Sequence, residues 1–278
     1  MAIASGRGSE FTLQRVLCTF PPEDTLKREL RTSVHLQLFT LACPTLLLVL
    51  LLTGCTSSSL PDSKDLVLLV PGAGGDGPWY SSLREGLTEG GVDLPVRKLS
   101  WGAPLPLYIV NLQDTSIHDG AERKLAERII QWRQAHPDGK LILLGHSAGC
   151  GVILGAMARL DPTVHVDHVV LLAPSVSPAY DLHPAAEHVD RRIDVFHSDR
   201  DTLWLQWRTG HFGTYDNVKT PAAGNVGFDL SSLDESLRGR ITQHPYDPDW
   251  QRLGNDGGHS GALSRAFVAR IIAPLLRS

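Results

Sequence analysis

Between residues 65 and 276 the chain alternates short, continuous apolar runs with longer stretches in which apolar residues recur at helical spacing. Continuous apolar runs are typical of strands buried on both faces of a sheet. They predict strands at 65–70, 95–100, 140–144, 168–172 and 192–196. The helical spacing predicts helices at 79–89, 120–136, 148–160 and 262–276. Strands and helices that alternate in this way predict an α/β domain with a doubly wound, mainly parallel sheet in three layers.

One region, 202–258, departs from this pattern. It is rich in aromatic residues, punctuated by Gly and Pro, and has no long periodicity, which predicts a large loop excursion with one short strand at 226–230. By contrast, only the stretch 174–190 separates the strand at 168–172 from the strand at 192–196. So short a connection leaves no room for a large helical cap.

A different hydrophobic pattern lies near the N-terminus, where residues 46–52 read LLLVLLL. Extended back to residue 38, the stretch is too short for a membrane span, which needs about 20 apolar residues. It has the length of the apolar core of a signal peptide, and Lys27, Arg28 and Arg31 upstream supply the positive charge expected before it. An ordinary buried or membrane-anchoring helix is the alternative.

The apolar run ends in Leu52-Thr53-Gly54-Cys55, followed by four polar residues. This resembles the lipobox of bacterial lipoproteins, which implies cleavage before Cys55 and attachment of lipid to it. The resemblance predicts a leader at 1–54 and a flexible tether at 55–64, with the α/β domain at 65–278 held on the outer side of a membrane in the bacterial cell envelope.

Composition narrows the possible partners. The chain carries 26 Lys+Arg and 30 Asp+Glu, a net charge of −4. Without residues 1–54 the count is 21 against 26, or −5, and this mild acidity argues against a nucleic-acid partner. Of the four cysteines, Cys18 and Cys43 would leave with the leader and Cys55 would carry lipid. Cys150 would then be the one remaining thiol, with no disulfide to form.

The strongest chemical signal is G-x-S-x-G at residues 145–149, between a predicted buried strand and a predicted helix. A nucleophile on a tight strand-to-helix turn needs small residues two positions to each side, and the helix N-terminus favours negative charge at the same point. This context makes Ser147 the candidate nucleophile.

With this motif, the chain from about residue 65 resembles the α/β-hydrolase superfamily. The resemblance implies that the nucleophile, the acid and the histidine follow in that order. It places the acid a few residues after the strand at 192–196, which favours Asp201 over Asp199. It also places the histidine at His259, in a Gly-rich loop before the last helix.

A second Gly cluster, Pro71 to Gly77, follows the first strand. In the superfamily this loop and the residue after the nucleophile supply the amides of the oxyanion hole, which implies Ala73 and Ala148. The cluster also fits the dinucleotide motif G-x-G-x-x-G, but that site needs an acidic residue at the end of the next strand, and Asp93 precedes the strand instead. His165 and His168 are spaced three apart, yet His168 begins a buried strand. We therefore expect neither a cofactor nor a metal.

These features predict a serine hydrolase that cleaves a small-molecule carboxylic ester through an acyl-enzyme. The same residues are compatible with a thioesterase, a peptidase or an acyltransferase. A catalytically silent, membrane-tethered binding or scaffold protein is the alternative from another class, because a fold does not guarantee activity. The predicted partners are the ester and a membrane reached through the lipid anchor, and the oligomeric state stays open.

Overall fold

Six parallel strands form one sheet in the order β2-β1-β3-β4-β5-β6. The computed structural model describes residues 63–75, 77–103 and 110–277. Within them the strands are β1 (Leu66–Val70), β2 (Val96–Lys98), β3 (Leu141–His146), β4 (Val166–Leu172), β5 (Val189–His197) and β6 (Ile241–Pro245). Because all six strands run the same way, their carboxyl ends share one edge of the sheet. Loops that leave this edge are therefore neighbours in space.

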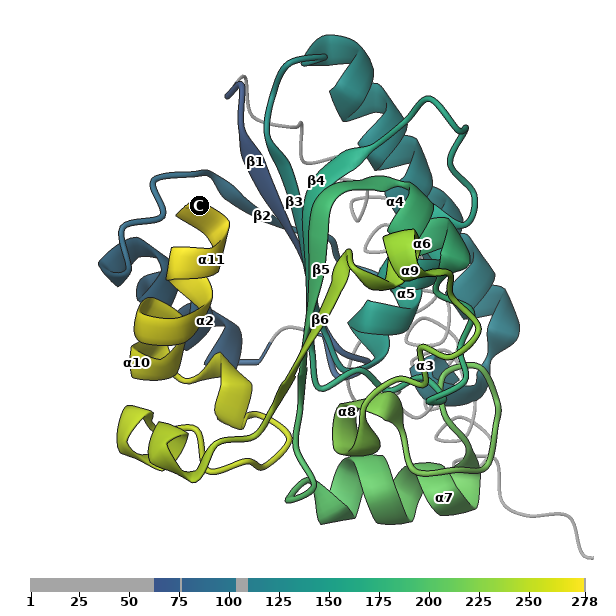
Figure 1. Ribbon diagram of the computed structural model, residues 1–278, viewed down its shortest axis with the longest axis vertical. Helices are drawn as coiled ribbons and strands as arrows, with labels where there is room; N and C mark the ends of the chain where they lie inside the picture. Colours follow the sequence, from purple (N-terminus) through teal and green to yellow (C-terminus); the bar gives the residue numbers. More distant parts are fainter. Residues whose placement is uncertain (1–62, 76, 104–109, 278) are drawn as a thin grey trace, which may run out of the picture. The chain divides into compact units, whose positions relative to one another are not determined.

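Helices cover both faces of the sheet (Figure 1). One layer contains α2 (Trp79–Glu89), α10 (Arg265–Phe267) and α11 (Ala273–Arg277), and the other contains α4 (Thr115–Ala135), α5 (Ala148–Met157), α6 (His183–Glu187) and α9 (Glu235–Arg238). Each face has its own apolar core: Leu66, Leu68 and Val70 of β1 belong to one, and Val67 and Leu69 to the other. Successive side chains of a strand point to opposite faces of the sheet, and both faces are buried here, so every position of β1 is apolar.

The layers and the strand order define a three-layer α/β/α structure with the α/β-hydrolase fold, as the sequence predicted. Short helical segments fill the connections at the carboxyl edge of the sheet and before the C-terminus: α3 (Val110–Gln113), the π-helical η2 (Thr202–Arg208), α7 (Thr209–Phe212), α8 (Ala223–Val226), the 3-10 turns η3 (Pro248–Leu253) and η4 (Gly261–Leu263), and the π-helical η5 (Val268–Ile272). The connection from β4 to β5 contains only α6.

The strand predicted at 226–230 is wrong. α8 ends at Val226, and the next residue, Gly227, has a φ of 86°, which takes the chain out of the extended region. The main chain of Phe228 then pairs with a side chain: its N–H donates to Oε1 of Gln243 (2.7 Å) and its carbonyl accepts from Nε2 of Gln243 (3.0 Å). The last strand is instead β6, which contains Gln243 and forms the partly exposed edge of the sheet beside β5. Its sequence, ITQHP, has no continuous apolar run because an edge strand is not buried on both faces.

Three predicted helices differ at their boundaries, and the one predicted at 148–160 ends at Met157 as α5. α4 begins five residues earlier than the predicted 120, because Asp114 caps it by accepting from the N–H groups of Ser116 (2.9 Å) and Ile117 (3.4 Å). The predicted helix at 262–276 is a 3-10 turn followed by α10, η5 and α11.

The predicted leader at 1–54 and Cys55 lie outside the described residues. No helix in the described part of the chain is long and apolar enough to span a bilayer.

Candidate active site

Ser147 lies on the tight turn between β3 and α5 and has φ 55° and ψ −127°. A positive φ is uncommon for a residue with a side chain, so the turn is strained at this serine. The flanking glycines explain how the turn fits. A Cβ at Gly149 would overlap the carbonyl oxygens of Val70 and Pro71, and one at Gly145 would lie 2.8 Å from Cδ1 of Ile153. The turn at Ser147 therefore requires glycine two positions to each side, as the sequence motif predicts.

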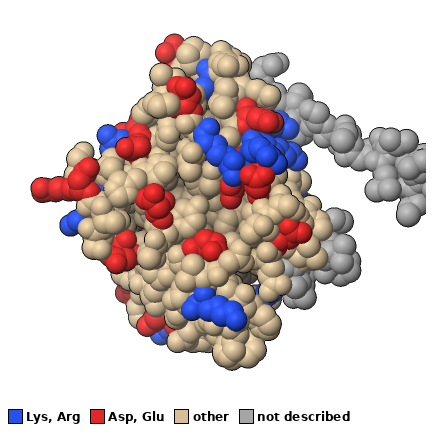
Figure 2. Space-filling view, turned by 90° about the vertical axis from the view of Figure 1, so that its right-hand side faces the viewer, with Lys and Arg blue, Asp and Glu red and all other residues tan. Residues whose placement is uncertain are grey.

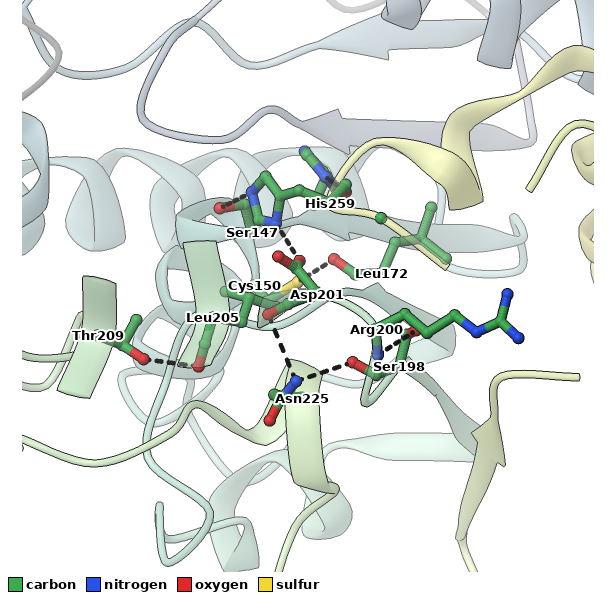
Figure 3. Close-up of polar contacts among 12 residues, drawn as sticks. Ser147, Cys150, Leu172, Ser198, Arg200, Asp201, Leu205, Thr209, Asn225 and His259 are labelled. Carbon is green, nitrogen blue, oxygen red and sulfur yellow. Dashed lines mark hydrogen bonds and ion pairs between the residues drawn. The ribbon is translucent and has the colours of Figure 1, made fainter. Parts of the chain in front are cut away.

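Three candidate residues form a continuous hydrogen-bonded chain (Figure 3). Nε2 of His259 lies 3.0 Å from Oγ of Ser147, and Nδ1 of His259 lies 2.6 Å from Oδ2 of Asp201. A neutral imidazole satisfies both contacts when Nδ1–H donates to the carboxylate and Nε2 accepts from the serine hydroxyl. The Asp201 side chain is 3% exposed and the His259 side chain 16% exposed. Asp199 lies in the exposed turn before Asp201, and no hydrogen bond in the described part of the chain uses its carboxylate.

The turn that holds Asp201 is fixed by its own main chain and by Asn225. The Asp201 N–H donates to the carbonyl of Ser198 (3.2 Å), and Nδ2 of Asn225 donates to the carbonyls of Ser198 (3.0 Å) and Asp201 (3.4 Å), as Figure 3 shows. η2 begins at the next residue. Asn225, at the end of α8, is 4% exposed, so it closes this turn from inside the protein. No pattern in the sequence connects Asn225 with a site 24 residues away.

The Trp204 side chain covers one side of the site. Its ring stacks on that of His259, with centroids 5.7 Å apart and an angle of 26° between the planes, while the Arg208 guanidinium lies 5.0 Å from its centroid. Trp204 is still 39% exposed. It belongs to the excursion between β5 and β6, which also contains the exposed apolar side chains Leu203, Trp207 and Phe212. Figure 2 shows acidic and basic groups interspersed on the upper part of the adjacent face and mostly uncharged surface below.

The two predicted oxyanion residues, Ala73 and Ala148, follow β1 and Ser147 respectively. No hydrogen bond within the described residues uses the main-chain N–H of either one. The loop around Ala73 is held by three buried side chains that the sequence analysis did not assign to the site. The Gly72 N–H donates to Oη of Tyr80 (2.7 Å), Nε1 of Trp101 donates to the carbonyl of Pro71 (2.8 Å), and Nδ2 of Asn111 donates to the carbonyl of Ala73 (2.9 Å).

A cavity of about 810 Å³ lies beside this loop. Pro71, Gly74 and Gly75 line one side of it, and Trp101, Gly120 and Lys124 are among the residues that line the rest. Such a volume is within the range of small-molecule sites, roughly 300–1,000 Å³. Its lining includes neither Ala73 nor Ser147 or His259, so the cavity lies beside the loop and not at the nucleophile itself.

Other candidate chemistry is not supported by the described residues. Among them, no group of three or more His, Cys, Asp and Glu side chains is placed to hold a metal ion. Cys150 is fully buried, and this burial raises the pKa of its thiol far above the ordinary value, which suppresses the reactive thiolate. The thiol packs in the apolar core behind Ser147 and is not a second nucleophile.

No family model matches the sequence, and no curated protein matches it either. Solved structures with a similar fold include a protein described as a hydrolase of the α/β superfamily from Xanthomonas campestris pv. campestris (18% identity, 77% of this chain and 98% of that chain, TM-score 0.43). They also include esterase PE8 (17% identity, 77% of this chain and 92% of that chain, TM-score 0.48). A third is the esterase domain of a Rhodothermus marinus protein (13% identity, 80% of this chain and 89% of that chain, TM-score 0.44). At these identities the likeness concerns the fold, and the function has to be argued from the site.

Proposed function

We propose that this chain is a serine hydrolase that cleaves a carboxylic ester, with Ser147 as nucleophile, His259 as general base and Asp201 as the residue that orients the base. The observation that carries the proposal is the continuous hydrogen-bonded chain from Ser147 through His259 to Asp201. A serine hydroxyl is a weak nucleophile until a neutral imidazole takes its proton, and the carboxylate steadies the imidazolium that results.

The proposed reaction has two halves. Oγ of Ser147 attacks the carbonyl carbon while Nε2 of His259 takes the hydroxyl proton, which gives a tetrahedral oxyanion. The ester C–O bond then breaks, and the alcohol leaves with the proton from His259. Water, deprotonated in turn by His259, attacks the acyl-enzyme and releases the carboxylic acid and free Ser147. Atoms and charges balance over the cycle without a cofactor.

The amides of Ala73 and Ala148 are proposed to receive the oxyanion. Both are without a hydrogen-bond partner in the described part of the chain, and Ala148 is the first residue of α5, where the helix dipole favours negative charge. Each such donor is typically worth about 3 kcal/mol of transition-state stabilisation.

Two observations separate this proposal from the alternatives. A silent scaffold gains nothing from a strained serine hydrogen-bonded to a histidine–aspartate pair, so the geometry favours an enzyme. The cavity of about 810 Å³ beside the Ala73 loop has room for an acyl or alcohol group of modest size, which favours a small ester. Thioesters, amides and transfer to acceptors other than water use the same residues, and they are distinguished by assay.

The test is labelling of the full-length protein with a fluorophosphonate probe, followed by mass spectrometry of the modified peptide. We expect one adduct at Ser147, no adduct in Ser147→Ala, and slow labelling in His259→Ala. Hydrolysis of an ester, a thioester and an amide with the same acyl group then ranks the substrate classes. Absence of labelling from a folded wild-type protein would reject the proposal in favour of a scaffold.

We also propose that the N-terminal leader directs the protein to the cell envelope, where lipid is attached to Cys55. The support is the apolar run followed by Leu52-Thr53-Gly54-Cys55. Expression of the wild type and of Cys55→Ala in a bacterium, followed by membrane fractionation and mass analysis of the mature N-terminus, tests this. Equal membrane association and an unmodified Cys55 would contradict it.

A further inference from the structure

His146, the residue before the nucleophile, is part of a second hydrogen-bonded chain that the proposed mechanism does not use. Its ring is 3% exposed and lies between Tyr80 and the loop that holds His259. Nδ1 of His146 is 2.9 Å from Oη of Tyr80, and Nε2 of His146 is 2.9 Å from the main-chain carbonyl of His259. Tyr80 in turn accepts from the Gly72 N–H at 2.7 Å.

The direction of each bond follows from the groups themselves. A carbonyl can only accept, so Nε2 of His146 carries a proton and donates it to His259. Burial, together with the nearby His259 ring, lowers the pKa of His146 to about 3, so the imidazole is neutral at any working pH. Nδ1 is then an acceptor, and the Tyr80 hydroxyl donates to it while accepting from Gly72.

This chain connects the two segments that flank Ser147. At one end is the loop of Gly72 and Ala73, which supplies a proposed oxyanion amide. At the other end is the loop of His259, which follows Gly257 and Gly258. Asp201 holds the imidazole of His259, but His146 holds its main chain.

We propose that His146 is a positioning residue: by donating to the His259 carbonyl and accepting from Tyr80, it keeps the general base and the oxyanion loop in register around Ser147. The inference rests on the proposed function and adds to it a residue that does not touch the substrate. A misplacement of the base by about 1 Å can cost roughly a hundredfold in rate. The expected effect is therefore on kcat, with KM little changed.

Substitutions at His146 separate its two bonds. Gln places an amide N–H near the position of Nε2 and keeps the donation to His259, whereas Asn places an oxygen near Nδ1 and keeps only the contact with Tyr80. Leu keeps neither. We expect His146→Gln to retain kcat within about threefold, and His146→Asn and His146→Leu to lose about 10- to 100-fold, with KM within about threefold in all three. Tyr80→Phe removes both the bond to Nδ1 of His146 and the bond from the Gly72 N–H, so it also releases the oxyanion loop and should cost about tenfold.

The matched control is His188→Leu, which removes the ring nitrogens as His146→Leu does. His188 is also a buried histidine that donates to a main-chain carbonyl, that of Val164 (2.8 Å through Nδ1), and Val164 lies two residues before β4, at the amino edge of the sheet. His188→Leu should change thermal stability without changing kcat. Thermal unfolding of every variant identifies any loss that comes from misfolding, and the Gln and Asn variants carry the test if Leu does not fold.

The measurement is kcat and KM on an ester substrate, together with the rate of fluorophosphonate labelling at Ser147. Rescue of kcat by Gln but not by Asn is the expected result. If Gln and Asn behave alike, or if Leu keeps full activity, the positioning role is wrong while Ser147 labelling still supports the proposed function. Loss of labelling in the wild type would instead overturn the proposed function itself.

Discussion

Two histidine–aspartate pairs in the described part of the chain have the same separation of 2.6 Å but lie in different places. In the first, Nδ1 of His259 is 2.6 Å from Asp201, and both residues are on loops beyond the carboxyl edge of the sheet. In the second, Nε2 of His168 is 2.6 Å from Asp194, and these residues are in the middle of β4 and β5. The same two groups at the same distance thus occupy a candidate active site and a sheet interior.

The difference is in the third partner and in access. The free nitrogen of His259 reaches Ser147, and its side chain is 16% exposed. The free nitrogen of His168 has no hydrogen-bond partner among the described residues, and both side chains of its pair are 0% exposed. A second histidine, His244 of β6, donates to the other oxygen of Asp194 at 2.7 Å. The pair inside the sheet therefore connects three strands, whereas the pair at the carboxyl edge connects a candidate base to the candidate nucleophile.

The two aspartates provide the largest contrast in activity. Asp201→Asn should lower kcat/KM by about ten-thousandfold, because the amide no longer fixes the tautomer of His259 or stabilises its imidazolium. Its effect on the free energy of unfolding should stay within about 1 kcal/mol. Ester hydrolysis and urea denaturation of the same preparation measure both quantities. An Asp201→Asn enzyme with near wild-type kcat/KM would exclude Asp201 as the acid of the triad.

Asp194→Asn should show the opposite profile. The carboxylate is buried, and although burial opposes its ionisation, the hydrogen bonds from His168 and His244 lower its pKa and keep it charged. Loss of the charge leaves both donors without their anion, and breaking such a buried pair costs about 3–5 kcal/mol. Urea denaturation should reveal that loss, while the folded fraction keeps its kcat. A large loss of kcat with unchanged stability would mean that the buried pair takes part in the chemistry.

The buried pair should also contribute to a pH effect on stability, beside His146, whose pKa is lowered by burial too. Burial lowers the pKa of His168, so below about pH 6.5 the unfolded chain takes up a proton that the native chain does not. More protons bound in the unfolded state means that stability falls as pH falls, by up to about 1.4 kcal/mol per pH unit for one group. Between pH 5 and 7 Asp194 stays ionised, so its own titration does not contribute to the change of stability with pH in this interval.

His168→Gln removes this titration but keeps an N–H that donates to Asp194. Its free energy of unfolding should depend less on pH than that of the wild type over the same interval. Equal slopes for the wild type and His168→Gln would show that His168 does not remain neutral in the native state.

The sequence predicted the parts of the molecule that depend on short patterns. Five strands, the turn at Ser147 and the three-layer arrangement follow from apolar runs and small residues within a few positions of each other. The positions of Asp201 and His259 came from the resemblance, and the structure brings both side chains to Ser147. Asp194 and His168, by contrast, look like ordinary strand residues in the sequence, because their pairing depends on the register between β4 and β5.

Contacts between distant segments could not be predicted. β6 is an edge strand and carries polar residues, so no apolar run marks it in the sequence. The more apolar stretch at 226–230 has the composition of a strand but does not form one. Asn225 and Trp204 reach the site from the excursion between β5 and β6, and Tyr80 reaches it from α2. These contacts depend on tertiary packing, for which the spacing of residues along the chain has no signature.

The smallest expected effect concerns Asp199, two residues before Asp201. The family pattern left this residue as the rival acid, but it lies in an exposed turn and no hydrogen bond in the described residues uses its carboxylate. Asp199→Asn should therefore change kcat/KM by less than about twofold and stability by less than about 0.5 kcal/mol. The same assay and denaturation used for Asp201→Asn provide the comparison. If Asp199→Asn lost activity while Asp201→Asn kept it, Asp199 would be the acid and the turn would have to move to bring it to His259. The burial of Asp201 would then not be the property that selects the catalytic carboxylate.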